Sequence, residues 1–260
     1  MTFDEVTDWS PEGDAWTMTL PPQWMQGRGA FGGILAAAAL RAMRTLVEPD
    51  RTPRCVTTTF LGPVTSEPVT MTARVLRAGK SVAFAEAEIS QAGTARVRVQ
   101  GVFGADRPSE LMLRAEPVVV PAVHGLPRFP YLPGITPEFI QCMDMRWAEG
   151  GVPFSSSEGS TVASHMRFTE PAARGYERIL ALLDVLPAPV LQNLSQPAPA
   201  STIAWTAHFC APDESQPGDF SFMRYDTVTA EHGYCTAIGK LYDQGGRLIA
   251  WQEQLQAVFG

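Results

Sequence analysis

An uninterrupted apolar run follows a pair of glycines near the start of the chain. From Ile34 to Leu40 no side chain is polar, so a helix here would be apolar on every face, which is the pattern of a buried helix. Gly32 and Gly33 stand at its first turn, where the backbone N–H groups have no partner inside the helix. Arg41 and Arg44 suit its last turns, where the carbonyl ends are negative. The pattern predicts a buried helix whose amide end is open to an incoming oxygen.

Short segments with alternating or β-branched apolar positions surround this helix. One precedes it at residues 14–20 and ends at a Pro-Pro pair. The others follow it and are separated by Gly or Pro, at residues 55–61, 69–76, 81–90 and 95–103. They predict an antiparallel meander after one helix.

The same order of elements returns after a proline-rich stretch. Seven prolines fall between Pro108 and Pro137, too many for a helix or a central strand, so residues 105–137 are predicted to be a linker. The predicted elements beyond it are strands at 139–149 and 160–168, a helix at 172–186, and strands at 201–210, 220–229, 234–242 and 247–258. Both halves end in Val-Phe-Gly, at 102–104 and 258–260. The repetition predicts a duplicated α+β chain with units at 1–104 and 138–260, two unrelated α+β domains being the alternative.

The two predicted helices differ in the chemistry that they offer. The second has no glycine pair, but Asp184 follows five apolar residues in it. If the helices lie side by side beneath a shared sheet, the first supplies backbone donors and the second a carboxylate. This asymmetry predicts one working site per chain.

Composition narrows the classes of partner. The chain has 27 acidic and 20 basic residues and a net charge of −7, without a basic run that could follow a phosphate backbone, so nucleic acid is not an expected partner. Neither a signal peptide nor a segment long enough to cross a membrane is recognisable, and we expect a cytoplasmic protein. The four cysteines and four histidines are scattered without ligand spacing, which predicts reduced thiols and no metal site.

Several motifs, taken in their order along the chain, resemble the acyl-CoA thioesterase II (TesB-like) family of double hot-dog proteins. In the first half they are Phe31-Gly32-Gly33, Thr59 to Pro63 and Leu76 to Ser81. In the second half they are Thr202 with His208-Phe209, Leu241 to Asp243, Gly246 to Ala250, and Gln254. The resemblance covers nearly the whole chain, and the order of the motifs carries it, because a Gly-Gly pair before a helix is common.

The resemblance implies a double hot-dog fold, in which a long helix is wrapped by an antiparallel sheet twice over. It implies hydrolysis of an acyl-CoA thioester to a free acid and CoA, with no cofactor beyond the CoA of the substrate. In related members an Asp, a Thr and a Gln of the second half activate the water, and these roles fall on Asp184, Thr202 and Gln254. Further pairing of sheets into a homo-oligomer is also implied.

The residue types suit this reaction. Thioester hydrolysis needs a base for the attacking water and donors for the carbonyl oxygen as it becomes negative. A carboxylate leaving an apolar helix is poorly solvated, which raises its pKa and makes Asp184 a better base, or a nucleophile if it reaches the carbonyl. Thr202 and Gln254 each offer a donor and an acceptor that can hold a water. The N–H groups of Gly32 and Gly33 are the predicted oxyanion donors.

Each assignment has a competing interpretation. Asp184 lies three residues before Pro187 and could be a solvated residue near a helix end, and the family pattern places its Asp where this chain has Leu182. Thr202 could be a structural strand residue. Gln252 and Gln256 would share a strand face with Gln254 and are rivals for its role. The phosphates of CoA are expected to meet basic residues near the mouth of the site, and the candidates are Arg77, Lys80 and Arg54.

Two other functions stay open at this point. A hot-dog hydratase or dehydratase would act on an acyl thioester, but such relatives use an Asp and a His a few residues apart, and no histidine follows Asp184 within twenty residues. A catalytically silent acyl-binding or assembly protein would not need Asp184, Thr202 and Gln254 to converge. Acyl chain length cannot be inferred from the pattern.

Overall fold

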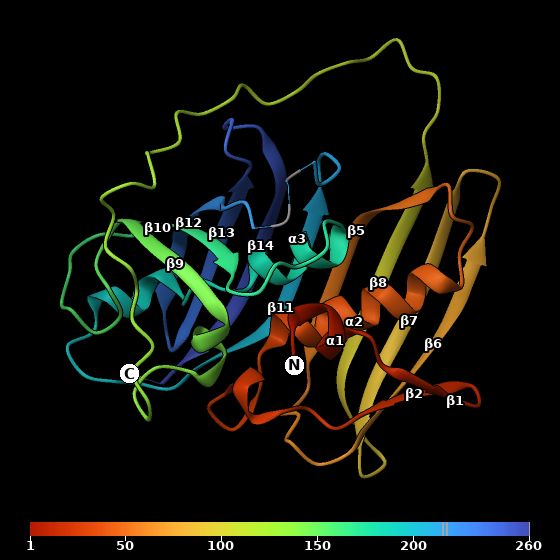
Figure 1. The fold of residues 1–260 in the computed structure, drawn as a ribbon, viewed down its shortest axis with the longest axis horizontal. Helices are drawn as coiled ribbons and strands as arrows, with labels where there is room; N and C mark the ends of the chain where they lie inside the picture. The colour runs from red at the N-terminus through yellow and green to blue at the C-terminus, as the bar shows by residue number, and fades with distance from the viewer. Residues whose placement is uncertain (215, 217, 260) are drawn as a thin grey trace.

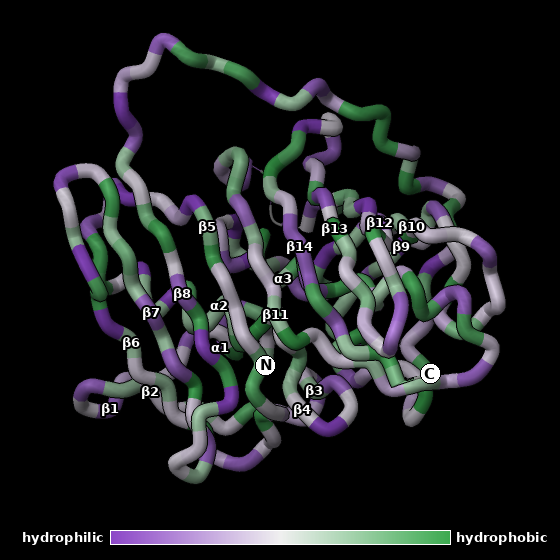
Figure 2. Tube along the Cα trace, turned by 180° about the vertical axis from the view of Figure 1, so that it is seen from behind, coloured by the Kyte–Doolittle hydropathy of each residue, from purple (hydrophilic) through white to green (hydrophobic). Residues whose placement is uncertain are grey.

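A single curved antiparallel sheet dominates the molecule, and its helices lie on one face. The computed structural model describes residues 1–214, 216 and 218–259, and within them twelve strands form one sheet. The helices α2 and α3 lie in front of the sheet in Figure 1 and behind it in the reverse view of Figure 2, so both views place them inside the curve of the sheet. A large antiparallel sheet with few helices agrees with the predicted α+β class.

The elements of the first half begin with a short helix. They are α1 (Phe3–Thr7), β1 (Ser10–Glu12), β2 (Ala15–Met18), η1 (Pro22–Trp24), β3 (Met25–Gln26), β4 (Gly29–Ala30), α2 (Gly32–Thr45), β5 (Arg51–Phe60), β6 (Val69–Ala78), β7 (Val82–Gln91) and β8 (Thr94–Ala105). Those of the second half are η2 (Glu138–Cys142), β9 (Met143–Glu149), β10 (Thr161–Phe168), α3 (Tyr176–Leu183), η3 (Pro189–Asn193), β11 (Ala200–Phe209), β12 (Ser221–Glu231), β13 (Tyr234–Tyr242) and β14 (Leu248–Val258).

The strand order is the same in both halves of the sheet. Going inward, the first half runs β2, β6, β7, β8, β5, and the second half runs β10, β12, β13, β14, β11. The halves meet where β5 pairs with β11, with Thr58 opposite Trp205. Each half therefore has a strand, a helix and a four-strand meander in matching positions, which is the order that the sequence pattern predicts.

The two central helices pack against each other in opposite directions. At the end of α2, Arg44 donates to both carboxylate oxygens of Glu177 in the first turn of α3, at 2.7 and 2.9 Å. At the other end, the first turn of α2 meets the last turn of α3 around Gly33 and Ala181. The small residues of α2 allow this close approach. Nearly all of the helix from Gly32 to Met43 is buried.

The segment between the halves lies outside the sheet. It arches away from the strands in Figures 1 and 2, and residues 106–137 contain no helix or strand apart from an isolated bridge between Arg128 and Arg146. The boundaries of the two predicted units stay a prediction, and Gly260, which the sequence pairs with Gly104, lies outside the described residues. Within the described part of the chain, no helix is long and apolar enough to cross a membrane.

Three boundaries in the second half differ from the sequence prediction by three residues or more. Residues 138–142, predicted as the start of a strand, form η2 and place Phe139 in the core. The second helix is shorter than 172–186 at both ends: it begins after Gly175 and ends at Leu183, with Asp184 in the C-cap position. Pro187 disfavours helical backbone at Leu186, so the helix does not reach the predicted end at 186.

The contact between the two helix ends leads to a test of stability. A Cβ on Gly33 would lie 2.5 Å from the Phe31 ring and 2.9 Å from the backbone oxygen of Ala181. We expect Gly33→Ala to separate the helix ends and to lower the free energy of unfolding by about 1–3 kcal/mol, as overpacking does. Gly79→Ala is the matched control, because its Cβ would meet Val82 O at an ordinary 3.4 Å. Equal denaturant midpoints for both variants would show that this contact is not tight.

Candidate active site

The candidate site lies where α2 begins and α3 ends. The Asp184 carboxylate accepts a hydrogen bond from the backbone N–H of Gly33. Its Oδ2 lies 2.7 Å from the point that a Cβ on Gly32 would occupy, so only glycine leaves room for the carboxylate there. Asp184 is partly exposed as a residue, but its carboxyl group is enclosed by Gln254 and by the first turn of α2. The structure thus joins the glycine pair and the acid that the sequence places on different helices.

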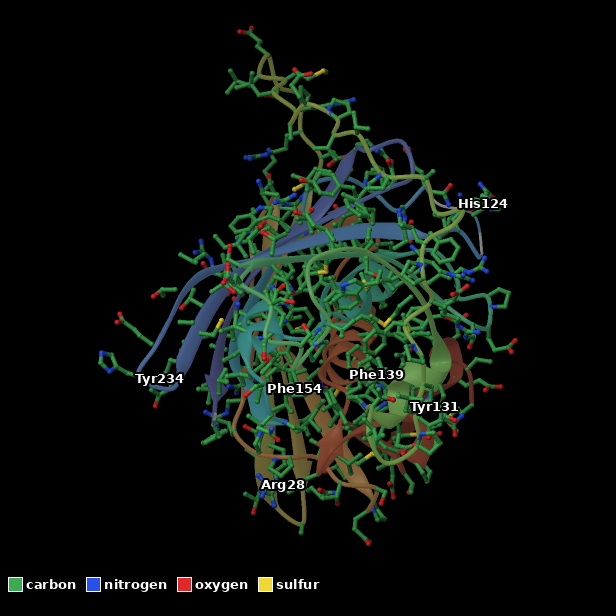
Figure 3. The ribbon with its side chains drawn as sticks, turned by 90° about the vertical axis from the view of Figure 1, so that its left-hand side faces the viewer. Arg28, His124, Tyr131, Phe139, Phe154 and Tyr234 are labelled. Carbon is green, nitrogen blue, oxygen red and sulfur yellow. The ribbon has the colours of Figure 1, made fainter. Side chains whose placement is uncertain are left out.

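An aromatic pair supports the glycine side of the site. The Phe31 ring folds over Gly33 and stacks on Phe139 with ring centroids 4.1 Å apart. Phe139 lies inside the molecule, between η2 and α2, as Figure 3 shows. The Phe60 ring of β5 would lie 2.9 Å from a Cβ on Gly32 and covers the neighbouring position. Apolar rings therefore flank the amide end of α2 and limit its contact with water.

Gln254 connects the carboxylate to Thr202. Its side chain is only 3% exposed on the inner face of β14. Its Nε2 donates to Asp184 Oδ1 at 2.9 Å, and its Oε1 accepts from Thr202 Oγ1 at 3.1 Å. The three predicted catalytic residues therefore form one hydrogen-bonded chain beside the start of α2.

A β-bulge turns Thr202 toward this chain. On β11 the side chains of Trp205 and Ala207 point inward, so simple alternation would place Ile203 inward as well. The pairing with β14 shifts by one residue between Thr202 and Ala204, which leaves Ile203 as the extra residue. Since a one-residue shift exchanges the faces of a strand, Thr202 reaches Gln254 on the inner face.

The surroundings of Asp184 raise its pKa to about 7 from an ordinary 3.8. Burial is the main cause, and the hydrogen bonds from Gln254 and Gly33 act in the opposite direction by stabilising the ionised form. The carboxylate also lies at the positive end of α2 and the negative end of α3, whose partial charges oppose each other. Asp184 is therefore poised to exchange a proton near neutral pH.

The two rival glutamines lie on either side of Gln254. Gln252, Gln254 and Gln256 all face inward and are at most 5% exposed. Among the contacts of the described residues, Gln254 is the one that bonds to Asp184, while Gln256 bonds to the buried hydroxyl of Tyr225. The strand pattern predicts that the three glutamines share a face. It does not predict the contact with Tyr225, because the local sequence around Tyr225 is that of an ordinary core aromatic residue.

The oxyanion role of Gly32 and Gly33 stays a prediction. Both Gly32 and Gly33 stand at the first turn of α2 as expected, but the N–H of Gly33 is already bonded to Asp184 rather than open. A carbonyl oxygen can take this donor only if the carboxylate shifts. The Gly32 end of the turn is thus the better candidate for receiving the oxygen.

The predicted CoA-binding residues lie at the other end of the sheet. Phe60 of β5 touches the start of α2, and Arg54 lies six residues earlier on that strand, about 20 Å away at the rise of a β-strand. Arg54 is bonded to Gly104 O and paired with Asp106. Arg77 and Lys80, at the β6–β7 turn, are exposed near this same end. The structure places these three residues away from the Asp184 cluster, and their contact with CoA stays a prediction.

The equivalent place in the first half has different chemistry. Val99 of β8 lies opposite Thr58 of β5, as Gln254 of β14 lies opposite Trp205 of β11. At the start of α3, the Asp213 carboxylate accepts from the backbone N–H of Gly175. This carboxylate also accepts from Arg178, whereas Asp184 accepts from Gln254, so the two helix starts differ in their chemistry. No group of three or more His, Cys, Asp or Glu within the described residues could hold a metal ion.

Models of two protein families match the chain in tandem. The acyl-CoA thioesterase N-terminal domain matches residues 20–104, and the acyl-CoA thioesterase C-terminal domain matches residues 116–258. A search of curated proteins found no match.

Several solved structures have the same fold. A hot-dog fold protein of unknown function from Alicyclobacillus acidocaldarius is 26% identical, with 99% of this chain and 98% of that chain covered and a TM-score of 0.89. The acyl-CoA thioesterase II TesB2 from Mycobacterium marinum is 17% identical, with coverage of 100% and 99% and a TM-score of 0.79. The tesB protein MAP1729c from Mycobacterium avium subsp. paratuberculosis is 15% identical, with coverage of 99% and 98% and a TM-score of 0.78.

The two family matches cover most of the chain in the order of its two halves, on a fold shared with hot-dog proteins over nearly their full length. The chain therefore belongs to the acyl-CoA thioesterase family and is a thioesterase of that family.

Proposed function

We propose that this thioesterase hydrolyses acyl-CoA at the Asp184 cluster, with one such site in a tandem of two hot-dog units. The observation that carries the proposal is the convergence of Asp184, Thr202 and Gln254 beside the amide end of α2. These groups come from three separate elements of the second half and one of the first. A structural role alone does not account for a buried carboxylate that accepts bonds from a helix start and from a buried amide.

The thioester carbonyl binds with its oxygen toward the first turn of α2. There the N–H of Gly32 and the positive end of the helix stabilise the oxygen as it becomes negative. The rings of Phe60 and Phe31 exclude bulk water from this position, which strengthens the electrostatic stabilisation.

Asp184 acts as the general base toward a water held near Thr202. As the water oxygen bonds to the carbonyl carbon, its proton passes to the carboxylate. The carbon–sulfur bond then breaks, and the proton passes from Asp184 to the leaving sulfur of CoA. A pKa of about 7 suits both transfers, because the group must accept and release a proton near neutral pH.

Gln254 orients its neighbours in this scheme. Its amide already makes four hydrogen bonds, to Asp184, Gln252, Thr202 and Gln256. Since an amide offers two donors and about two acceptor sites, its capacity is used. Gln254 therefore fixes the direction of the carboxylate and of the Thr202 hydroxyl, and these two groups face the water.

The other two functions receive less support. Hydration would need a histidine beside the acid, yet His165 bonds to Pro121 O and His208 stacks on Trp251 on the opposite face of the sheet. A silent binding protein would leave the convergence of the three residues unexplained. Pairing of sheets between copies, and contacts between CoA and Arg54, Arg77 or Lys80, stay predictions.

Replacing the base leads to the first functional test. We expect Asp184→Asn to lower thiol release from acetyl-, octanoyl- and palmitoyl-CoA by at least about 100-fold, because an amide cannot accept the proton. The folded protein should persist, since an amide of equal size still fits beside Gly32. Thiol release and circular dichroism measure the two effects.

Glu253→Gln is the control for this variant, because Glu253 adjoins Gln254 on β14 but is exposed on the opposite face. It should keep the parent rate. Parent-like turnover in Asp184→Asn would remove this residue from the mechanism, and a parent without activity on any CoA ester would favour the silent alternative.

The pH dependence of the rate tests the state of the same group. The base works when ionised, so kcat/KM for octanoyl-CoA should rise with pH and reach half its plateau near the Asp184 pKa of about 7. An ordinary aspartate would place this midpoint near about 4. A rate that is flat across the neutral range would contradict burial of the carboxylate as the cause of its basicity.

A further inference from the structure

The inner face of β14 carries more polar side chains than the proposed reaction uses. Three glutamines, Gln252, Gln254 and Gln256, follow one another on this face, and all are buried. Burying amides is unfavourable unless their hydrogen bonds are made. The corresponding positions of β8 include Val97 and Val99, so the architecture itself does not require amides here.

The three amides are bonded in a single direction. Gln256 Nε2 donates to Gln254 Oε1 at 2.9 Å, and Gln254 Nε2 donates to Gln252 Oε1 at 3.3 Å. Gln256 Nε2 also donates to the hydroxyl of Tyr225 at 3.2 Å. We call Gln252, Gln254, Gln256 and Tyr225 the amide ladder.

The ladder supports the orientation in which the nitrogen of Gln254 faces the acid. The two ends of a carboxamide have nearly the same shape, so only its partners fix its orientation. A reversed Gln254 would place its oxygen against Asp184 Oδ1 and Gln252 Oε1, and its Nε2 against the Nε2 of Gln256. Reversal of the whole ladder would relieve the contacts with Gln252 and Gln256, but the Gln254 oxygen would still face the Asp184 oxygen.

The anchor of the ladder is Tyr225. Within the described residues, Gln252 Nε2 and Gln256 Oε1 have no hydrogen-bond partner. Each end of the run of three amides therefore has one unpaired polar atom. The Tyr225 hydroxyl is thus the contact outside the run that holds Gln256 in place. Tyr225 lies on β12 and is fully buried.

We propose that Gln256 and Tyr225 are positioning residues of the thioesterase reaction, which hold the Gln254 amide with its nitrogen toward Asp184 and its oxygen toward Thr202. The proposal rests on the proposed function of Asp184 as the base. Neither residue touches the substrate in this scheme. Their effect reaches the reaction through the direction of the Gln254 hydrogen bonds.

The charges around the ladder make its effect measurable. The titratable groups here are Asp184 at the end of α3, Tyr225 on β12 and Cys235 on β13. Burial raises the pKa of Tyr225 well above its usual range and also raises the pKa of the Cys235 thiol, so both stay neutral near pH 7. Of these three groups, Asp184 alone changes charge there.

A looser ladder changes the proton affinity of Asp184 in a known direction. The Gln254 hydrogen bond lowers the pKa of Asp184 by stabilising the ionised form, so weakening it raises that pKa further above 7. The folded-state pKa already exceeds the ordinary 3.8. The stability that Asp184 contributes is therefore fully present below the unfolded-state pKa and is lost as pH rises through the folded-state pKa.

The kinetic test uses Tyr225→Phe and Gln256→Met on the full chain with octanoyl-CoA as the probe. Each variant should lower kcat about five- to tenfold, as loss of one supporting hydrogen bond does, without raising KM. The acid limb of the rate profile should move to higher pH in both. Tyr242→Phe is the matched control, because Tyr242 is also buried in a sheet strand but packs in a separate cluster with Ala163 and Phe222, and it should behave as the parent.

A second readout does not depend on activity. The Tm of each protein is measured against pH, and the Tm of its counterpart with Asp184→Asn is subtracted. The difference isolates Asp184, and the pH at which it levels off should move upward in Tyr225→Phe and Gln256→Met but not in Tyr242→Phe.

The two readouts separate the proposals. If the parent hydrolyses no CoA ester but the levelling pH still moves, the proposed function fails and the ladder stands. If the parent is active and the ladder variants keep its kcat, acid limb and levelling pH, the positioning role is wrong. A loss of Tm that is equal at every pH, with or without Asp184, would show that Gln256 and Tyr225 act only through core packing. This result would also overturn the positioning role.

Discussion

The whole site depends on how closely the first turn of α2 approaches the last turn of α3. With Ala181 O only 2.9 Å from the Cβ position of Gly33, the two helix ends are in contact through their backbones. This contact places the Asp184 carboxylate against a helix start that has no side chain to exclude it. It also sets a buried acid between opposite helix dipoles, and the sheet then needs only to supply groups that hold the acid in place.

Those groups come from β11, the strand of the second half that pairs with β5, and from its neighbour β14. Both strands pass beneath the helix contact. The corresponding part of the first half has Val97 and Val99 in place of two of the amides, and the Asp213 carboxylate at the start of α3 is paired with Arg178. The two halves thus contribute different groups to the site. The first half gives the backbone donors, and the second half gives the acid and the amides. Burying Asp184 and three glutamines does not improve packing. We therefore infer that these polar groups lower the stability of the fold and are kept for the function of the site.

Much of this arrangement follows from the sequence, because local patterns carry it. The apolar run after Gly32 and Gly33 predicts a buried helix, and the alternation around Gln254 predicts a strand with three glutamines on one face. The remaining features arise from contacts between distant segments. The bulge at Ile203 depends on pairing between β11 and β14, the bond from Gly33 to Asp184 depends on the antiparallel helix contact, and Tyr225 joins the network only through the order of the sheet. The basic residues near the β6–β7 turn lie at the other end of the strands from Asp184, and their contact with CoA stays a prediction.

The central claim is that one thioester carbonyl binds between the amide end of α2 and the acid at the end of α3. The most direct measurement is a crystal structure of Asp184→Asn with octanoyl-CoA bound. The account predicts the thioester oxygen about 3 Å from the Gly32 nitrogen, with residue 184 and Thr202 facing the carbonyl carbon. A thioester bound elsewhere, such as in the hollow of about 440 Å³ beside Arg54 and Arg107, would contradict it.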